Sequence, residues 1–329
     1  MKTVFVTGPD GLLGSNVIRE LVSRNFSVVA MAQKGREPKT IKDLPIKIVE
    51  GDITVKQNLI DLSKGCDYFI HTAAVTDLWP TRSAHYYKIN LEGTKNAVDA
   101  AAINKVQRFV HVGSASTFAP GSLQRPGNEN TSSRKPPYPH DYIESKRIAH
   151  EHVLDAVKTR NLPAVVVCPT FMIGPFDSKP GPGQFVLAVA KKKMPFVSKG
   201  GKNWVAAKDV ATAMVNALER GKPGESYILG GHNLSYRDAV KLIAQALEQS
   251  KYPKLEIPDM LILLAGMADS LRSRLLNIPP KVSFSMSRLA CNKLYYSSEK
   301  AIRELGLPVS PLETSIKDLK TWFEENGYL

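Results

Sequence analysis

Hydrophobic residues recur along the chain in short β-branched runs, separated by longer segments with helical spacing. The runs expected to form strands are "TVFVT", "SVVAMA", "IKIVE", "YFIHTA", "RFVHVG", "AVVVC" and "SYILG". Helical spacing between them is clearest in "LLGSNVIRELVSRN", "EGTKNAVDAAAI" and "DVATAMVNALERG". The strand runs lack polar alternation, which predicts a parallel sheet buried on both faces. Regular alternation of strands and helices therefore predicts an α/β fold with a doubly wound sheet of the Rossmann type.

The pattern changes after the last of these runs and becomes mostly helical, which predicts a smaller C-terminal region beside the sheet. Two segments rich in glycine and proline, residues 119–139 and 174–184, follow predicted strands. Open α/β sheets bind ligands at the carboxyl ends of their strands. Long loops at such ends are often functional. We therefore expect both segments to lie near a binding site.

Composition is that of an ordinary globular protein, with 43% hydrophobic and 23% charged residues. The longest apolar run, "MLILLAGMA", is far shorter than the about 20 residues that cross a bilayer, so no transmembrane segment is expected. Three widely separated cysteines, Cys66, Cys168 and Cys291, show neither a disulfide framework nor metal-ligand spacing. This cysteine usage predicts a reducing compartment, the cytoplasm.

The chain carries a net charge of +13, which attracts anions in general. Its densest basic segment, Lys191 to Lys202, lacks the interleaved aromatic residues of a nucleic-acid stacking surface, so no nucleic-acid partner is expected. A solvated surface is the favoured interpretation, and help with an anionic ligand is the alternative. Residues 260–276 carry apolar residues at helical spacing, which favours burial against the core. A membrane-surface or hydrophobic-substrate role, to which Arg272 and Arg274 add weight, is the alternative.

The first strand run leads directly into "TGPDGLLG", in which Gly8, Gly11 and Gly14 are spaced three apart. A dinucleotide-binding turn needs glycine for a tight bend, for close approach of the backbone to a pyrophosphate, and for close helix–strand packing. The helix expected to begin near Leu12 directs its free N–H groups and positive dipole end at the phosphates. The segment therefore predicts a pyrophosphate-binding turn.

Residues after the second strand run indicate which dinucleotide is bound. An acidic residue there binds the ribose 2′-hydroxyl of NAD. Here the run is followed by Gln33, Lys34, Gly35 and Arg36, and the two cations suit a 2′-phosphate. NADP is therefore favoured over NAD, with a basic surface turn as the alternative. Asp52 follows the third strand run, where it is expected either to bind the adenine amino group or to serve as a turn residue.

Tyr142 and Lys146 are four residues apart in "HDYIESKRIAHE", so on a helix they share one face. A free phenol has a pKa near 10, and a nearby ammonium lowers that pKa, which makes tyrosine a usable general acid/base. Lys146 is also expected to hold the nicotinamide ribose. Ser114, at the end of the fifth strand run, is expected to hydrogen-bond the substrate oxygen.

These motifs occur within a longer series of segments: "VTGPDGLLG", "VEGDIT", "HTAAVTDLW", "INLEGTKNAV", "GSAST", "YIESK", "CPTFMIGP", "KDVATAMVNALERG", "YILGG" and "SSEKAIRELG". In content and order they resemble the extended short-chain dehydrogenase/reductase family, and more narrowly the dihydroflavonol 4-reductase group with its bacterial hopanoid-associated relatives. The resemblance spans almost the entire chain. It implies reduction of a ketone or aldehyde by NADPH, or oxidation of the alcohol.

The resemblance also assigns residues. It implies a catalytic trio of Ser114, Tyr142 and Lys146 and a dinucleotide-binding domain over residues 1–170, to which 204–230 returns. Residues 171–203 and 231–329 are then the substrate-binding region. Positions expected to bind cofactor are Gly8, Gly11, Leu12, Leu13, Gly14, Gln33, Lys34, Arg36, Asp52, Ile53, Ala73, Ala74, Lys146, Pro169 and Met172. Candidates to line the substrate pocket, together with Ser114 and Tyr142, are Asp77, Trp79, Phe118, Phe171 and Phe185. The oligomeric state stays open, with a homodimer as one form.

Three of the positions that depart from the family pattern bear on the expected site. Gln33 stands where relatives usually have arginine, so 2′-phosphate binding depends on the cations that follow it. Gly113 replaces the first of two serines, which leaves Ser114 as the better match for the reactive serine and Ser116 as the second candidate. Cys168 stands where relatives commonly have asparagine, and we expect it to be buried and inert.

Two alternative functions share this scaffold. A nucleotide-sugar epimerase or dehydratase would keep NAD tightly bound and use the Lys191 to Lys202 segment for a diphosphate. The missing acidic residue after the second strand run argues against it. A non-catalytic NADP-binding sensor is the second alternative, and the intact Tyr142 and Lys146 argue against it.

Overall fold

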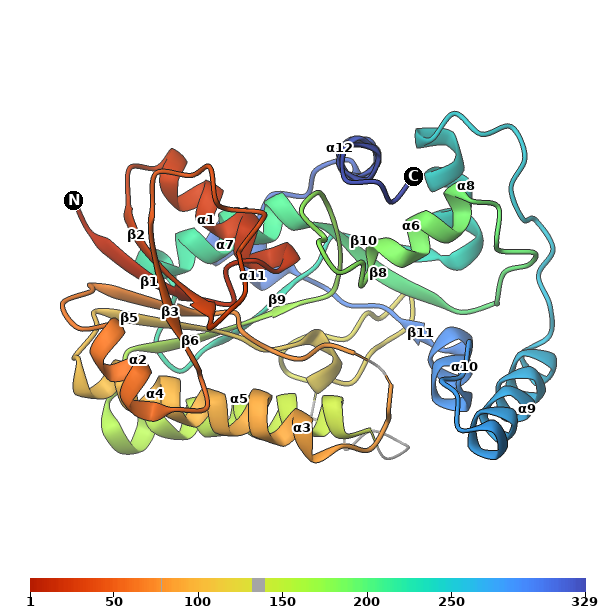
Figure 1. Ribbon diagram of the computed structural model, residues 1–329. Coiled ribbons are helices and arrows are strands. Elements are labelled where there is room, and N and C mark those ends of the chain that lie inside the picture. Colours follow the sequence, from red (N-terminus) through yellow and green to blue (C-terminus); the bar gives the residue numbers. More distant parts are fainter. Residues whose placement is uncertain (78, 132–139) are drawn as a thin grey trace.

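The computed structural model describes residues 1–77, 79–131 and 140–329. The seven predicted strands all form, and they make one parallel sheet in the order β3-β2-β1-β4-β5-β6-β9 (Figure 1). The predicted fold class is therefore confirmed. The strands are β1 (Thr3–Thr7), β2 (Ser27–Gln33), β3 (Lys47–Gly51), β4 (Tyr68–His71), β5 (Arg108–Val112), β6 (Ala164–Pro169) and β9 (Ser226–Leu229).

The strand order reverses beside β1. The chain builds β2 and β3 on one side of β1 and then places β4 on the other, with Thr7 paired to Met31 in β2 and to His71 in β4. In an open parallel sheet, the crevice between the carboxyl ends of the strands at this reversal is the usual ligand site. The glycine turn after β1 and the segment after β4 therefore meet where a ligand is expected.

Helices cover both faces of the sheet (Figure 1). One layer contains α1 (Leu12–Ser23), α7 (Ala207–Arg220) and α11 (Glu299–Leu305), and the other contains α2 (Lys56–Leu62), α4 (Gly93–Ile103) and α5 (Asp141–Arg160). A separate hydrophobic cluster lies under each layer. Every residue of β4 and β6 is buried, because both faces of these strands are covered. Burial on both faces explains why the strand runs lack polar alternation.

A second, smaller sheet was not predicted. It is formed by β7 (Phe171–Ile173), β8 (Gly201–Ala206), β10 (His232–Ser235) and β11 (Lys293–Leu294). Strand β8 pairs with the other three, antiparallel to β10 and parallel to β7 and β11. The expectation of a mostly helical C-terminal region was therefore incomplete. Its strands are short, and "GKNWVA" begins with residues of low β-propensity, so tertiary pairing decides their conformation.

Helices surround this smaller sheet. They are α6 (Gly183–Ala190), α8 (Tyr236–Ala246), α9 (Asp259–Leu276), α10 (Phe284–Cys291) and α12 (Leu312–Glu325). A third hydrophobic cluster, which includes Trp204 and Phe323, fills the space between α6, α8, α12 and the sheet. The predicted division of the chain at residues 170, 204 and 230 stays a prediction. In the structure α7 and β9 lie with the larger sheet, and β8 lies in the smaller one. Residues 132–139 of the predicted long loop lie outside the described residues.

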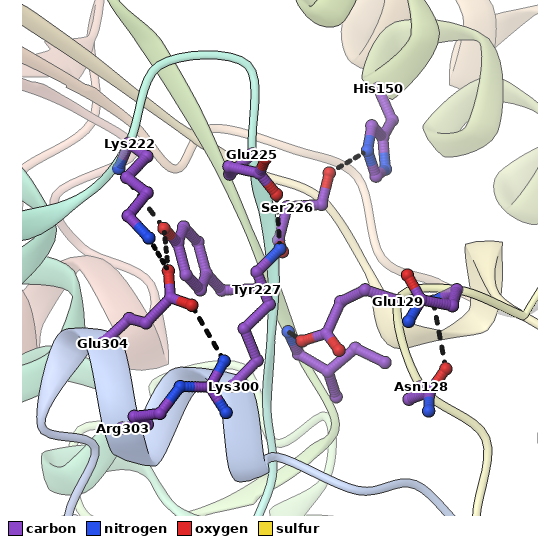
Figure 2. Close-up of polar contacts among 12 residues, drawn as sticks. Asn128, Glu129, His150, Lys222, Glu225, Ser226, Tyr227, Lys300, Arg303 and Glu304 are labelled. Atoms are coloured by element: carbon purple, nitrogen blue, oxygen red, sulfur yellow. Dashed lines mark hydrogen bonds and ion pairs between the residues drawn. The ribbon is translucent and has the colours of Figure 1, made fainter.

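Strand β9 forms one edge of the larger sheet, and side chains satisfy two of its outward backbone groups. The Ile228 N–H donates to Glu129 Oε1 at 2.7 Å, and Lys300 Nζ donates to the Ser226 carbonyl at 2.8 Å (Figure 2). An open strand edge carries unpaired donors and acceptors that attract other chains. Glu129 and Lys300 occupy part of the position that a further strand would take.

The hydrogen bond between the Ile228 N–H and Glu129 predicts an effect on stability. Replacing Glu129 with alanine leaves the Ile228 N–H without its acceptor, so we expect the free energy of unfolding to fall by about 1–3 kcal/mol. Glu151→Ala is the matched control, because among the described residues the exposed Glu151 carboxylate pairs with Arg147 alone, and loss of this ion pair costs under about 1 kcal/mol. Urea denaturation of both variants measures the difference. Equal losses in the two variants would show that Glu129 does not protect the edge.

Candidate active site

The turn after β1 has glycine where a side chain does not fit. Gly8 has φ +68°, and a Cβ there would lie 2.7 Å from the backbone N and Cα of Ala73. A Cβ on Gly14 would lie 2.1 Å from the Gly8 carbonyl oxygen. At Gly11 a Cβ would meet only that same oxygen, at 3.7 Å, so the backbone faces open space. Two glycines are therefore needed for packing, and the third leaves room for a ligand at the strand reversal.

Helix α1 begins at Leu12, immediately after this turn. Its first turn contains no acidic residue, and no described side chain caps it. Leu12 and Leu13 are buried and anchor the helix start on the sheet. The N–H groups of an uncapped helix start, with the positive end of the dipole, make a binding site for an anion. The residues present therefore fit the pyrophosphate of a dinucleotide.

The turn after β2 lies next to the glycine turn, because β2 is the neighbour of β1 in the sheet. Strand β2 ends at the exposed Gln33, whose carbonyl accepts a hydrogen bond from the Arg36 N–H at 3.0 Å. Lys34 and Arg36 are both exposed, and neither forms an ion pair with a described residue. Two cations are thus available at this edge of the sheet.

The predicted adenine-binding residues follow β3. One carboxylate oxygen of Asp52 accepts hydrogen bonds from the N–H and the hydroxyl of Thr54, both at 2.8 Å, so Asp52 does stabilise a turn. Ile53 is buried and packs against Gly93 of α4. Binding of adenine by Asp52 and Ile53 stays a prediction.

Ser114 and Tyr142 come together at the carboxyl ends of the strands. Tyr142 is the second residue of α5, and the Ser114 hydroxyl, just after β5, lies close enough to its phenol to influence its pKa. Ser114 Oγ also lies 2.7 Å from Ser116 Oγ. Burial raises the pKa of Tyr142, and the nearby Ser114 hydroxyl lowers it in part. The phenol is therefore protonated at neutral pH, with a hydroxyl group beside it.

Lys146 lies one turn further along α5 and is 4% exposed. Its ammonium donates a hydrogen bond to the Val112 carbonyl at the end of β5, at 2.5 Å. Burial lowers the pKa of Lys146 to about 8, so the amine still carries its charge at neutral pH. The prediction that this charge lowers the pKa of Tyr142 was wrong for the protein as it stands. Burial outweighs other effects on the phenol, and the ammonium points at a backbone carbonyl instead.

Buried histidines surround Lys146, and sequence reasoning gave them no role. Burial, followed by the charge of Lys146, lowers the pKa of His71 to about 3 and that of His150 to about 4, so both rings are neutral. A hydrogen bond of 2.8 Å joins His71 Nδ1 to Thr7 Oγ1 in β1. The ends of β1 and β4 are therefore linked through a neutral ring next to the glycine turn.

Asn90 is a further residue that sequence reasoning missed. It lies on the π-helix Tyr87–Glu92, and such helices occur frequently at functional sites. Its side chain accepts from the Val75 N–H at 2.8 Å and donates to the Val75 carbonyl and to Ser145 Oγ, both at 3.1 Å. Asn90 thus ties the segment after β4 to the helix that carries Tyr142. Asn90 lies in the family segment "INLEGTKNAV", but no motif spacing identified it as a functional residue.

Gly113 and Cys168, two residues that depart from the family pattern, pack against each other. A Cβ on Gly113 would lie 2.8 Å from Cys168 Sγ, so a side chain at position 113 competes with the thiol for space. Cys168 is fully buried, as predicted, and burial raises its pKa to about 12. The thiol is therefore protonated and unreactive. Glycine at 113 accommodates cysteine at 168.

The candidate substrate residues lie on different elements. Phe171 and Phe185 pack edge-on against Trp204 in the third cluster, with ring centroids 4.8 Å and 5.2 Å away. Asp77 and Trp79 are exposed on the segment after β4. Ala73 and Ala74 of that segment are half-buried, as is Met172 in β7, whereas Pro169 at the end of β6 is buried. The roles of all these residues toward substrate and cofactor stay predictions.

A pocket of about 290 Å³ lies apart from the glycine turn, between α5, β9 and α11. Its lining includes Phe118 and His150 but none of the residues expected to bind cofactor. The basic side chains that line it are neutralised by ion pairs. Arg147 pairs with two glutamates of its own helix. Lys300 pairs with Glu225 at 2.6 Å (Figure 2). We therefore assign no reaction to this pocket.

Comparisons with known proteins agree with this geometry. Residues 4–230 match the family described as "NAD dependent epimerase/dehydratase family". The chain is 30% identical to the "4-hydroxy-2-methyl-3-oxo-4-farnesyl-3,4-dihydroquinoline-1-oxide ketoreductase" of Stigmatella aurantiaca, over 93% of this chain and 91% of the relative. It is 24% identical to the "Dihydroflavonol 4-reductase" of Arabidopsis thaliana, over 97% and 87%. The crystal structure of gox2253 superposes with a TM-score of 0.88 at 30% identity and covers 100% of both chains.

The glycine turn yields a prediction for cofactor binding. Gly14→Ala forces a Cβ against the Gly8 carbonyl and displaces the turn, so we expect the Kd for a nicotinamide dinucleotide to rise by about tenfold or more. Gly181→Ala is the control, because the nearest atom to a Cβ there is 3.9 Å away. Titration of protein fluorescence measures both affinities. Unchanged binding by Gly14→Ala would remove the turn from the cofactor site.

Proposed function

Because the chain belongs to the NAD dependent epimerase/dehydratase family of enzymes, within the extended short-chain dehydrogenase/reductases, we propose that it is an NADPH-dependent oxidoreductase that interconverts a carbonyl compound and its alcohol. One observation carries this proposal. The Ser114 hydroxyl lies close enough to the Tyr142 phenol to lower its pKa, at the edge of the sheet that also carries the glycine turn, with the buried ammonium of Lys146 one helical turn away.

Each residue of the trio has a separate task in this proposal. When bound, the nicotinamide supplies a hydride to the carbonyl carbon in the reductive direction. Tyr142 donates its phenolic proton to the carbonyl oxygen, and its raised pKa keeps that proton in place at neutral pH until reaction. Ser114 orients the phenol and the substrate oxygen. The Ser114 hydroxyl stabilises the phenolate left after proton donation, which solvent then reprotonates, and Lys146 is proposed to hold the nicotinamide ribose.

The turn after β2 supports NADP rather than NAD. Lys34 and Arg36 are exposed beside the glycine turn, and the first carboxylate after β2 is that of Glu37. A 2′-phosphate needs cations at this position, whereas a ribose 2′-hydroxyl needs an acidic acceptor at the strand end. Asp52, Ile53, Ala73, Ala74, Pro169 and Met172 complete the proposed cofactor site.

The substrate is proposed to be a largely apolar ketone or aldehyde. The name of the Stigmatella aurantiaca relative specifies a ketone that carries a farnesyl group, and that of the Arabidopsis thaliana relative a dihydroflavonol. The aromatic rings of Phe171 and Phe185, near β7, are proposed to line the pocket. Asp77 is proposed to contact polar groups of the substrate.

Replacing Tyr142 with phenylalanine tests the catalytic assignment. The variant lacks the transferable proton, so kcat for ketone or aldehyde reduction is expected to fall at least about 100-fold. The Kd for NADPH is expected to stay within about twofold, because the phenol does not hold the phosphates. Tyr252→Phe, on the half-buried tyrosine between α8 and α9, is the matched control. The rate of NADPH oxidation over a panel of carbonyl compounds measures the effect.

Wild-type turnover by Tyr142→Phe would contradict the proposed mechanism. The test also separates the alternative function. NAD that copurifies with the protein and survives gel filtration, with no NADPH oxidation by any carbonyl compound, would favour a nucleotide-sugar epimerase or dehydratase.

The cofactor preference is tested at the turn after β2. In the Lys34→Ala, Arg36→Ala double variant two charge-assisted contacts to the 2′-phosphate are lost, so the Kd for NADPH is expected to rise at least about tenfold. The Kd for NADH is expected to stay unchanged. Lys39→Ala removes another exposed lysine from the same loop and serves as the control. Equal weakening of NADPH and NADH binding would show that the two residues do not contact the 2′-phosphate.

A further inference from the structure

Helices α9 and α10 pack against each other at the periphery of the smaller region (Figure 1). The favoured sequence interpretation, burial of 260–276 against the core, was wrong. Only Ile262, Gly266 and Ser273 of α9 are buried. Seven large apolar side chains of this helix are between 50% and 74% exposed: Met260, Leu261, Leu264, Met267, Leu271, Leu275 and Leu276. We call these seven residues the α9 apolar face.

The contact between the two helices is made by small and polar residues. A Cβ on Gly266 would lie 2.0 Å from Ser287 Oγ of α10 and 3.2 Å from the Phe284 Cα, so the helices approach closely there. Ser273 and Ser287 are buried, and the Ser287 hydroxyl has no partner among the described residues. A helix pair in water buries its leucines and exposes its serines. The opposite distribution, with small residues between helices and large apolar ones outside, is typical of helices in contact with lipid.

Basic residues border the apolar face. At the angular spacing of an α-helix, Arg272 and Arg274 fall on opposite sides of the stripe formed by Leu264, Leu271 and Leu275. Residues 259–291, from the start of α9 to the end of α10, contain four basic and two acidic residues. These are Arg272, Arg274, Lys281 and Arg288 against Asp259 and Asp269. The sign agrees with the net charge of +13 of the whole chain. An apolar stripe with a basic border is complementary to a lipid surface with anionic headgroups.

Two observations limit what can dock on the α9 apolar face. Across the described residues no helix is long and apolar enough to cross a membrane. A symmetric contact with a second copy of the chain would place Arg274 and Lys281 against the same basic region of the partner. Such a contact brings like charges together, whereas an anionic surface neutralises them.

We propose that the α9–α10 hairpin docks on a lipid surface with anionic headgroups. The α9 apolar face lies in the interface plane, about 5–10 Å deep at the boundary between headgroups and acyl chains. Arg274 and Lys281, both exposed, contact the headgroups. Docking through this face does not depend on the proposed reaction.

Sedimentation with lipid vesicles tests the proposal. The full chain is expected to sediment with vesicles of phosphatidylglycerol and phosphatidylcholine, and much less with phosphatidylcholine alone. Leu264→Glu with Leu271→Glu places charge in the apolar face, and the partition coefficient is expected to fall at least about tenfold. Arg274→Gln with Lys281→Gln is expected to lower binding to the anionic vesicles by about 30-fold and to reduce its dependence on salt.

Controls keep the outcome decisive. Val55→Glu with Val309→Glu changes two apolar side chains that are 45% and 43% exposed elsewhere on the molecule, and binding is expected to match the unmodified protein. Circular dichroism and NADPH binding verify that every variant is folded. Vesicle binding by the Leu264→Glu, Leu271→Glu variant at the level of the control would overturn the proposal. Analytical ultracentrifugation that shows this variant converting a dimer to a monomer, without vesicle binding by the unmodified protein, would assign the face to a second copy instead.

Discussion

One buried ammonium organises the candidate active site. Lys146 is almost completely enclosed, and a buried charge without a partner is strongly destabilising. Its partner is the Val112 carbonyl at the end of β5, and this hydrogen bond ties α5 to that strand. The histidines around it are held neutral by burial and by its charge, so they add no repulsion. With Lys146 placed in this way, Tyr142 one turn earlier falls beside Ser114, at the carboxyl edge of the strands.

The same edge carries the rest of the proposed chemistry. Because the strand order reverses beside β1, the glycine turn and the segment after β4 lie side by side at one edge of the sheet, and Gly8 packs directly on Ala73. Asn90 connects that segment back to α5. The proposed cofactor-binding turn and the proposed proton donor are thus connected through one packed unit. The smaller region adds a different property, an apolar face with a basic border that is directed to solvent rather than to the core.

The larger sheet was predictable because most of its strands are largely apolar runs, which local sequence displays directly. Glycine spacing after the first run marked the turn, and the Tyr142 and Lys146 spacing marked their common helix. Three features were not accessible in this way. The smaller sheet depends on pairing between segments far apart in the chain. The direction of the Tyr142 pKa shift depends on tertiary burial and on where the ammonium points. Helical spacing in α9 predicted an apolar stripe correctly, but spacing does not say whether that stripe faces the core or the solvent.

The burial of Lys146 is the premise on which the site depends, and its titration measures that burial directly. Carbon-13 NMR of protein labelled at the lysine side chains, with the Lys146 signal assigned by its loss in Lys146→Met, gives the pKa of the free protein. Enclosure beside the Val112 carbonyl predicts a value of about 8, well below the ordinary 10.5 of lysine. A titration at the ordinary value would mean that the ammonium is solvated, and it would contradict the placement of Tyr142 and the proposed proton transfer together.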